Sequence, residues 1–518
     1  MVASLLKVIS SGIQDERLTF KHTLFPFKKI WIKAGRFTTQ WGRLDFENTP
    51  TFGNTAYFRI LRKGHLITRL FLVAQMPDIY STQKAAQDAQ PLSTIYPKFG
   101  WTNSLGHALV EQLTLDIAAA RVETIDSRLL EILDEFNTPL EKVPIVNELI
   151  RRKDHGFTQQ SFGWPPTPVQ LTPPIPYNET VIVPLPFWFT RGDFGCALPI
   201  DAIPMDEVRV GITFRNLNGC YYTDTHVPNT SLEPGTSLWT LPGSNFYTAP
   251  PQAPPLNPGN PILNANGIPI QMPLNLQLGE CYILAEYVYL DQNEANRFRL
   301  ADLQMPVVQH YAMNPFQTRS LPTARIRLDI PNPTRDIFFM LNRQEAPRYN
   351  AYFLGTRDLT GNVNTLPDGT NTPWWPDALG LYAQSPSSFL RPGFSLSDSE
   401  PLLGYELDYE GNLVRFRTQG PALFRSVIPS YEQRKTPWVN RYYYNLPLAI
   451  QNGFTPFSRP QGEANLDKIV NRDLVLQLRP VRGNIGGTVV PSYVVHIYAA
   501  TYNILRVYGG RAGMMFAY

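Results

Sequence analysis

Apolar residues alternate with polar ones in short runs along much of this chain, and the pattern predicts β-strands. The clearest run covers residues 208–214, in which every second side chain is apolar: Val208, Val210, Ile212 and Phe214. A period of two over this length is typical of a strand with one buried face and one solvated face. Proline and glycine separate the runs and interrupt the chain before it can form long helices.

Similar runs predict further strands in both halves of the chain. They cover residues 55–60, 65–75, 109–117, 187–189, 281–290, 325–330, 336–341, 438–450, 473–479 and 493–505. Residues 126–136 instead have the i, i+3/i+4, i+7 spacing of an amphipathic helix, with Asp126 as the expected N-cap. A second, short helix is expected within residues 143–152.

The runs follow one another in a similar order in the two halves. An aromatic run, an alternating run, a gap rich in proline or glycine and a tyrosine-rich run occur in that order within residues 187–290 and again within 438–505. The residues themselves barely align, so the order rather than the identity favours a duplication.

Composition supports an all-β chain with long, stiffened loops. The sequence contains 48 prolines in 518 residues, nearly twice the ~26 expected at average usage. Its aromatic fraction of 12% suits pleated surfaces. The hydrophobic fraction of 43% is enough for substantial cores, and the length favours two large domains or three smaller ones.

Charge and cysteine content narrow the classes of protein. The formal net charge of +3 is spread along the chain, so no sequence-specific nucleic-acid binding is expected. The basic run at residues 151–153 is interpreted as a solvated helix end. Three cysteines favour a reducing compartment over a disulfide scaffold, and Cys196 and Cys281 are expected to be buried thiols. The sequons at Asn178 and Asn229 leave glycosylation open.

The sequence lacks the spacings that catalysis, phosphate cradles or metal sites require. Its seven histidines form no HxxxH or HxH pair, and no nucleotide-binding or nucleophile-elbow motif occurs. No run approaches the roughly 18 apolar residues of a membrane span. His496 is interpreted as a packed histidine, and Asp134 with Glu135 as the polar face of a helix. No catalytic, cofactor-binding or metal-binding residue is predicted, and the chain is expected not to be an enzyme.

A series of motifs occurs in a fixed order along nearly the whole chain. They are LLKVISSGIQDERLT at 5–19, FRILRKGHLI at 58–67, RLFLV at 69–73, LGHAL at 105–109, PLPFWF at 184–189 with ALP at 197–199, YVYLD at 287–291 and AATYNILRVYGG at 499–510. Together they resemble the major capsid proteins of the nucleocytoplasmic large DNA viruses, and PLPFWF is the most recognisable of them. Two departures are that His65 stands where the family usually has aspartate and that Ala119–Ala120 replace a customary Gly-Gly.

This resemblance implies an all-β fold of two tandem eight-stranded jelly-roll β-sandwiches, a double jelly roll, with a few short helices in loops. It divides the chain into an N-terminal arm (1–22), a first jelly roll (23–295, with a proline-rich insertion at 216–278) and a second jelly roll (296–518). The implied function is structural: homotrimers with a pseudo-sixfold outline tile an icosahedral shell around a large double-stranded DNA genome. The implied location is the virion capsid, assembled in the host cytoplasm.

The resemblance also implies partners and local roles. Neighbouring capsomers are expected partners, and residues 1–20 are expected to face the interior, towards minor capsid or cement proteins and an inner membrane. The insertion is expected to form an exposed tower or trimer cap, whose deletion would leave trimers intact. The aromatic side chains of residues 187–189 are expected to pack in a core rather than to form a binding platform.

Two other classes of protein would share this composition. A carbohydrate-binding β-sandwich would expose tryptophan and tyrosine on one face, whereas Trp374–Trp375 is interpreted as a loop packed against a neighbour. A β-sandwich glycoside hydrolase would need two carboxylates that converge in a cleft. A stable trimer in light scattering would favour the capsid over a glycan-binding monomer.

Overall fold

The computed structural model describes residues 36–77, 98–102, 104–152, 169–170, 180–192, 194–223, 277–344, 352–353, 355, 400–410, 413–418, 420–421, 423–437, 441–450, 461–482 and 488–516. Several sequence predictions lie outside these residues. They concern the N-terminal arm, almost all of the 216–278 insertion, the two sequons and Trp374–Trp375.

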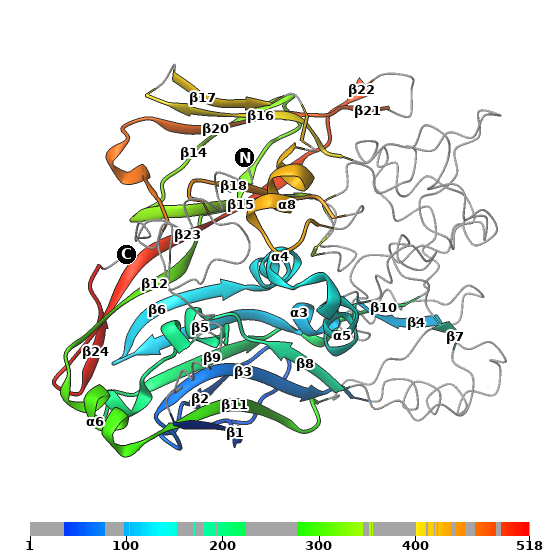
Figure 1. Ribbon diagram of the computed structural model, residues 1–518. Coiled ribbons are helices and arrows are strands. Elements are labelled where there is room, and N and C mark those ends of the chain that lie inside the picture. The colour runs from blue at the N-terminus through cyan, green and yellow to red at the C-terminus, as the bar shows by residue number, and fades with distance from the viewer. Residues whose placement is uncertain are drawn as a thin grey trace, which may run out of the picture.

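Two β-sandwiches are stacked one above the other, and each consists of two facing sheets (Figure 1). In the first sandwich the strand orders are β1-β11-β3-β8 and β2-β9-β5-β6. The strands of the first sheet are β1 (Phe37–Leu44), β11 (Cys281–Leu290), β3 (Leu66–Gln75) and β8 (Thr180–Pro184). Those of the second sheet are β2 (Thr55–Arg59), β9 (Val208–Phe214), β5 (Val110–Ile117) and β6 (Ala120–Asp126).

The second sandwich is built in the same way from the later part of the chain. One sheet contains β12 (Leu303–Ala312), β23 (Tyr493–Tyr508), β15 (Pro333–Arg343) and β18 (Tyr443–Pro447) in that order. Short strands extend it: β13 (Phe316–Gln317) and β24 (Arg511–Met514) on β23, and β19 (Ala464–Asn465) on β15. The facing sheet contains β14 (Thr323–Arg327), β20 (Arg472–Leu478), β16 (Leu402–Tyr409) and β17 (Leu413–Thr418).

Both sandwiches have the same topology. When the eight main strands of each are numbered in chain order, the two sheets follow the orders 1-8-3-6 and 2-7-4-5 in the first sandwich and again in the second. This is the arrangement of an eight-stranded jelly roll, so the predicted double jelly roll is confirmed. The repeated order of runs in the sequence reflects this repeated topology.

Short helices connect the strands, as predicted. The α-helices are α3 (Leu105–Leu109), α4 (Ser127–Asn137), α5 (Val143–Leu149), α6 (Gln292–Leu300) and α8 (Ile428–Glu432). The 3₁₀ helices are η1 (Leu140–Lys142), η3 (Trp188–Thr190), η4 (Phe194–Cys196), η5 (Ile200–Ala202), η6 (Leu217–Gly219) and η11 (Leu466–Lys468). A π-helix, η10, covers Leu423–Val427. Small sheets are formed by β10 (Tyr221–Thr223), β4 (Lys98–Trp101) and β7 (Val169–Gln170), and by β21 (Val481–Arg482) with β22 (Thr488–Val489).

Alternating side chains build the two cores. In β9 the four apolar residues named above are buried, as the period of two predicted. The core of the first sandwich also includes residues of the second, among them Phe338, Tyr443 and Tyr498, so apolar packing continues between the sandwiches. Cys196 is buried as expected, and Cys281 is half-buried.

The aromatic block at residues 187–189 differs from the predicted strand. After β8 ends, the chain turns into η3, where the Thr190 hydroxyl donates a hydrogen bond to the Phe187 carbonyl at 3.0 Å. Pro184 and Pro186 lack the backbone N–H that continued sheet pairing would need. The side chains nevertheless pack in the core as expected: Phe187 and Phe189 stack at 5.7 Å, and Trp188 meets Phe189 edge-on at 5.2 Å.

The turn between β5 and β6 contains Ala119, the first residue of the Ala119–Ala120 departure, and Ala120 begins β6. Ala118 and Ala119 connect the strands with φ of 52° and 65°. A two-residue hairpin turn with both φ positive favours Asn-Gly, and each alanine there costs about 1 kcal/mol. Ala118→Asn with Ala119→Gly is therefore expected to raise the free energy of unfolding by about 1–2 kcal/mol in urea denaturation.

A matched control for this turn is Ala301→Gly, at an exposed residue with φ of −89°. There glycine gains no conformational relief, and stability should stay equal or fall slightly. Equal effects at the two sites would contradict the strain at the hairpin.

The second departure, His65, also has a local explanation. Its Nδ1 accepts a hydrogen bond from the backbone N–H of Leu290 at 2.9 Å, which holds the end of β11 against the turn before β3. An aspartate oxygen can accept such a bond as well, so histidine preserves the acceptor.

Candidate functional site: the junction between the two sandwiches

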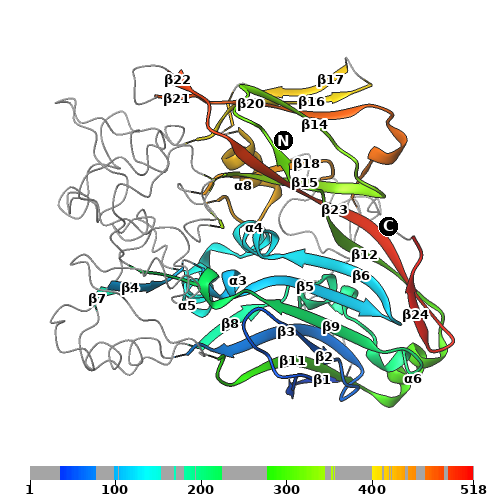
Figure 2. The ribbon, with the colours of Figure 1, turned by 180° about the vertical axis from the view of Figure 1, so that it is seen from behind.

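Helix α4 lies between the two sandwiches in both views (Figures 1 and 2). Its N-cap is Asp126, whose carboxylate accepts a hydrogen bond from the Leu129 N–H at 2.8 Å, as predicted. The predicted apolar stripe is buried in the first core, and its members are Leu129, Leu130, Leu133 and Phe136. The rest of the helix is not solvated, because Glu131 and Glu135 are each 0% exposed.

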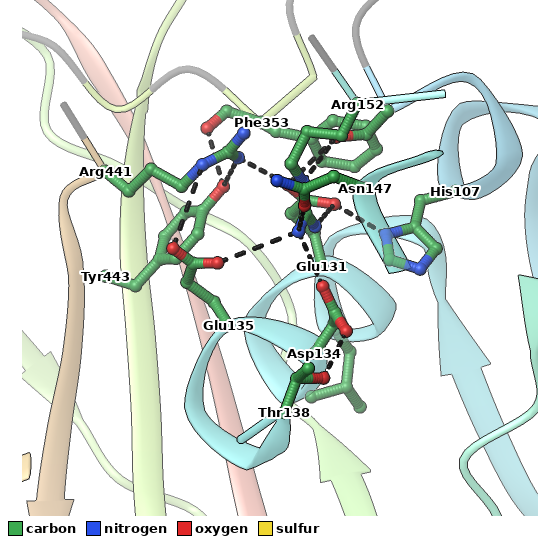
Figure 3. A network of polar contacts seen from close by, with 12 residues as sticks. His107, Glu131, Asp134, Glu135, Thr138, Asn147, Arg152, Phe353, Arg441 and Tyr443 are labelled. Carbon is green, nitrogen blue, oxygen red and sulfur yellow. Dashed lines mark hydrogen bonds and ion pairs between the residues drawn. The ribbon is translucent and has the colours of Figure 1, made fainter. Parts of the chain in front are cut away.

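Glu131 is held by polar groups of the first sandwich (Figure 3). Its Oε2 lies 2.7 Å from Arg152 Nη2 and 2.5 Å from His107 Nδ1. The Ser104 hydroxyl donates to Oε1 at 3.1 Å. Arg152 also lies 2.7 Å from Asp134 Oδ2 and donates to Asn147 Oδ1 at 3.1 Å, so its buried guanidinium joins α4 to the end of α5.

Two cations of the second sandwich reach the same carboxylates. Lys435 Nζ lies 2.8 Å from Glu135 Oε2, and Arg441 pairs with Glu131 through Nη1. Arg441 also donates to the Tyr443 hydroxyl at 3.3 Å, which donates in turn to the Phe353 carbonyl at 2.9 Å. Within the described residues, Glu131, Asp134 and Glu135 thus face three cations: Arg152, Arg441 and Lys435.

The cations keep this network ionised. Burial alone would raise the pKa of Glu131, but Arg152, Arg441 and His107 together hold that pKa well below its ordinary value. Burial would likewise lower the pKa of Arg152, but the carboxylates of α4 raise it well above its ordinary value. Buried ion pairs add little net stability over apolar packing, yet removal of one partner is costly. The network therefore links the two sandwiches through α4, and loss of any one partner would leave a buried charge unpaired.

Further contacts extend the junction along β6 and β12. His310 Nδ1 lies 2.7 Å from Glu123 Oε1, and the Gln309 side chain donates to the Val122 carbonyl at 2.9 Å. The Tyr498 hydroxyl donates to Asp126 Oδ2 at 2.6 Å, so the N-cap of α4 is itself bound by the second sandwich.

Two sequence interpretations are wrong at this junction. Arg152 is not part of a solvated helix end, because its side chain is 1% exposed within the network. Asp134 and Glu135 are polar as predicted, but Glu135 is buried and Asp134 half-buried, so this face of the helix is packed rather than solvated. The spacing of Glu131 and Glu135 at i and i+4 was a visible signal of a second interacting face. Their partners Lys435 and Arg441 lie 300 and 310 residues away in the chain.

His496 is packed in a strand as predicted, on β23 at 8% exposure. Burial and the nearby charge of Arg128 lower its pKa to about 3. Because the unfolded state takes up a proton near pH 6.5 and the folded state does not, stability falls as pH drops below that value, by ~1.4 kcal/mol per pH unit.

Replacement of His496 by glutamine should therefore flatten the pH dependence of unfolding. Between about pH 6 and pH 4, the natural protein is expected to lose roughly 2–3 kcal/mol more than the variant in urea denaturation. The control is the same pair at about pH 8, where the imidazole is neutral in both states. Parallel curves across the acid range would contradict a buried, neutral His496.

The described residues contain no group of three or more histidine, cysteine or acidic side chains that could hold a metal ion. A glycosidase needs a carboxylic acid with a raised pKa, whereas the pKa of Glu131 is lowered. Burial does raise the pKa of Glu400 to about 7, but that carboxyl is 0% exposed and contacts the buried side chains of Tyr444 and Arg425. The carboxylates of α4 therefore do not support the hydrolase alternative. No described helix is long and apolar enough to cross a membrane.

Two jelly rolls in tandem define a class of viral coat proteins, and comparisons with known proteins place the chain within it. This chain belongs to the family of large eukaryotic DNA virus major capsid proteins: the model described as "Major capsid protein N-terminus" matches residues 25–291, and "Large eukaryotic DNA virus major capsid protein" matches residues 296–513. The recognition made from the sequence motifs is confirmed.

Relatives and solved structures agree with this assignment. The major capsid protein of Wiseana iridescent virus is 24% identical over 484 residues, which cover 89% of this chain and 81% of that protein. Capsid protein 1 of Acanthamoeba polyphaga mimivirus is 22% identical over 68% of this chain, but the match spans only 51% of that protein's length. The match to probable capsid protein 4 of the same virus spans 39% of its length.

Two solved structures share the fold. The quasi-atomic model of the PBCV-1 virus capsid superposes with a TM-score of 0.62 at 16% identity, covering 95% of this chain and 100% of that chain. The Faustovirus major capsid protein superposes with a TM-score of 0.59 at 10% identity, covering 98% and 99%.

Proposed function

We propose that this chain is a structural shell subunit, three copies of which form a capsomer with a pseudo-sixfold outline that tiles an icosahedral virion around a large double-stranded DNA genome. The observation that supports this most is the repeated jelly roll. Each chain contains two sandwiches of the same topology, joined by a continuous core. Three chains around a threefold axis would therefore place six similar sandwiches around that axis. Many weak contacts between such units add up across a shell.

The trimer is tested by light scattering and negative-stain microscopy on the purified full chain. A particle of about 176 kDa, three times the 58.8 kDa of one chain, with a hexagonal outline is expected. A stable monomer, or particles without this outline, would contradict the proposal.

The domain boundaries belong to the same proposal: an arm at 1–22, a first jelly roll at 23–295 and a second at 296–518. All described strand pairs of the first sandwich fall between residues 37 and 290, and those of the second fall between 303 and 514. Helix α6 spans the gap between them. The insertion at 216–278 is placed within the first jelly roll, between β9 and β11.

We further propose that the role is not enzymatic and that the partners are neighbouring capsomers in the virion capsid, assembled in the host cytoplasm. Residues 1–20 are proposed to face minor capsid or cement proteins and an inner membrane. Crosslinking of intact particles that placed this arm on the exterior would contradict that part.

A further inference from the structure

A half-open cavity of about 280 Å³ lies beside the C-terminal end of α4, close to the junction. Its apolar lining includes residues from α4, from α5 and from the end of β8 with the two residues that follow: Leu130, Leu133, Val146, Pro184, Leu185 and Pro186. The prolines and the packed helix make this lining stiff, so the space is pre-formed. The established family and the proposed shell function assign nothing to it.

Positive charge surrounds this apolar space. Arg69, Lys142, Arg191 and Arg434 line it, and of these Arg69 lies 3.2 Å from Glu286 Oε2. Among the described lining residues the carboxylate is that of Asp134, which is already held by Arg152 at 2.7 Å and by the Thr138 hydroxyl at 2.6 Å. Burial, and to a smaller extent the charges of Arg335 and Arg434, lower the pKa of Arg191 to about 10, while Glu123 acts in the opposite direction.

Exposed apolar side chains lie close in sequence to the cations on both sandwiches. Leu140 and Ile145 are 62% and 63% exposed and flank Lys142 in the segment of η1 and α5. In the second sandwich Tyr431, 75% exposed, lies three residues before Arg434. A small free anion would make no use of these side chains, whereas an extended partner would cover them.

We propose that this cavity is a docking site for a peptide segment of a partner protein in which an acidic residue adjoins a large apolar one. The apolar side chain fills the space over Leu130 and Leu133, and the carboxylate pairs with Lys142 and Arg434. A buried anchor ringed by charge-assisted hydrogen bonds is the usual form of such recognition. All of the lining residues come from one chain, so the test can be made on the chain itself.

The test pans random dodecapeptides displayed on phage against the immobilised full chain. Enriched sequences are expected to carry aspartate or glutamate next to phenylalanine, leucine or tryptophan. Each enriched peptide is then synthesised with a fluorescent label, and its affinity is measured by anisotropy. Replacement of its acidic residue by the corresponding amide should weaken binding about tenfold or more.

Variants of the chain locate the site. The double variant Lys142→Glu with Arg434→Glu reverses the charge, and Val146→Trp fills the apolar space; each should weaken peptide binding about tenfold or more. Lys468→Glu, at an exposed lysine outside the cavity, reverses one positive charge and is matched to the single variant Lys142→Glu; it should leave affinity unchanged. Thermal melting checks that each variant folds. If either the charge-reversal variant or Val146→Trp does not fold, the other one still tests the site.

Several outcomes would overturn the proposal. They are no enrichment over the bare surface, enriched peptides without acidic residues, and equal binding by all the variants. Saturable binding of inorganic phosphate that Lys142→Glu with Arg434→Glu abolishes, without peptide binding, would assign the cavity to small anions instead.

Discussion

Replacement of Glu131 by glutamine is expected to lower the free energy of unfolding by about 3–5 kcal/mol. The carboxylate is 0% exposed and contacts Arg152, Arg441 and His107. The amide keeps the shape of the side chain but leaves two buried guanidinium groups short of negative charge. Because Arg441 comes from the second sandwich, the loss should fall on the junction as well as on the first core. Urea denaturation followed by tryptophan fluorescence measures it.

The matched control is Glu207→Gln. Glu207 also pairs with an arginine, Arg59 at 2.8 Å, but its side chain is 62% exposed. Exposed ion pairs contribute about 0–1 kcal/mol, so this variant should unfold almost like the natural protein. If the two substitutions had equal effects, the buried network would not hold the sandwiches as described.

Replacement of Trp188 by alanine is expected to lower the free energy of unfolding by about 3–5 kcal/mol. The indole is 1% exposed and packs edge-on against Phe189 in the first core. Truncation removes its apolar contacts and leaves a cavity that the stiff, proline-flanked turn cannot close. Trp188→Phe should cost less, since the indole N–H has no hydrogen-bond partner within the described structure.

The control for this prediction is Trp41→Ala on β1, where the side chain is 53% exposed. That variant also removes one tryptophan, so the fluorescence signals are comparable, and it should cost less than about 1 kcal/mol. A small effect at Trp188 together with a large one at Trp41 would mean that the aromatic block is a binding surface rather than core.

The local sequence pattern predicted the strands well, because in a half-buried strand alternate residues face the core and the solvent and are apolar and polar accordingly. The alternation in 208–214 reproduces the burial of β9, and Asp126 caps α4 as its position suggested. The pairing of strands into jelly rolls came from the family motifs, since strand order depends on contacts between distant segments. Within the PLPFWF motif, burial was predicted correctly but the backbone was not, because the prolines end the strand before the aromatic residues begin.

The polar network at the junction between the two sandwiches could not be predicted from the sequence. A buried carboxylate and a solvated one look alike in a helix, and the cations that decide between them lie about 300 residues further along the chain. Arg152 had the same ambiguity, since a basic run at a helix end is most often solvated. The docking cavity likewise combines residues from both sandwiches, so no local pattern marks it.

The contacts between β6 and β12 have a consequence for solubility. Each is the outermost strand of its sheet, and such strands offer unpaired backbone groups to any other extended chain. Here the Gln309 side chain donates a hydrogen bond to the Val122 carbonyl of β6. The Glu123 carboxylate accepts a hydrogen bond from the backbone N–H of His310 in β12 at 3.0 Å. Side chains of each edge strand thus form hydrogen bonds with a backbone group of the other strand, and β6 and β12 remain in separate sheets. At these positions the two borders of one chain are closed to pairing with another extended chain, and no partner chain is needed.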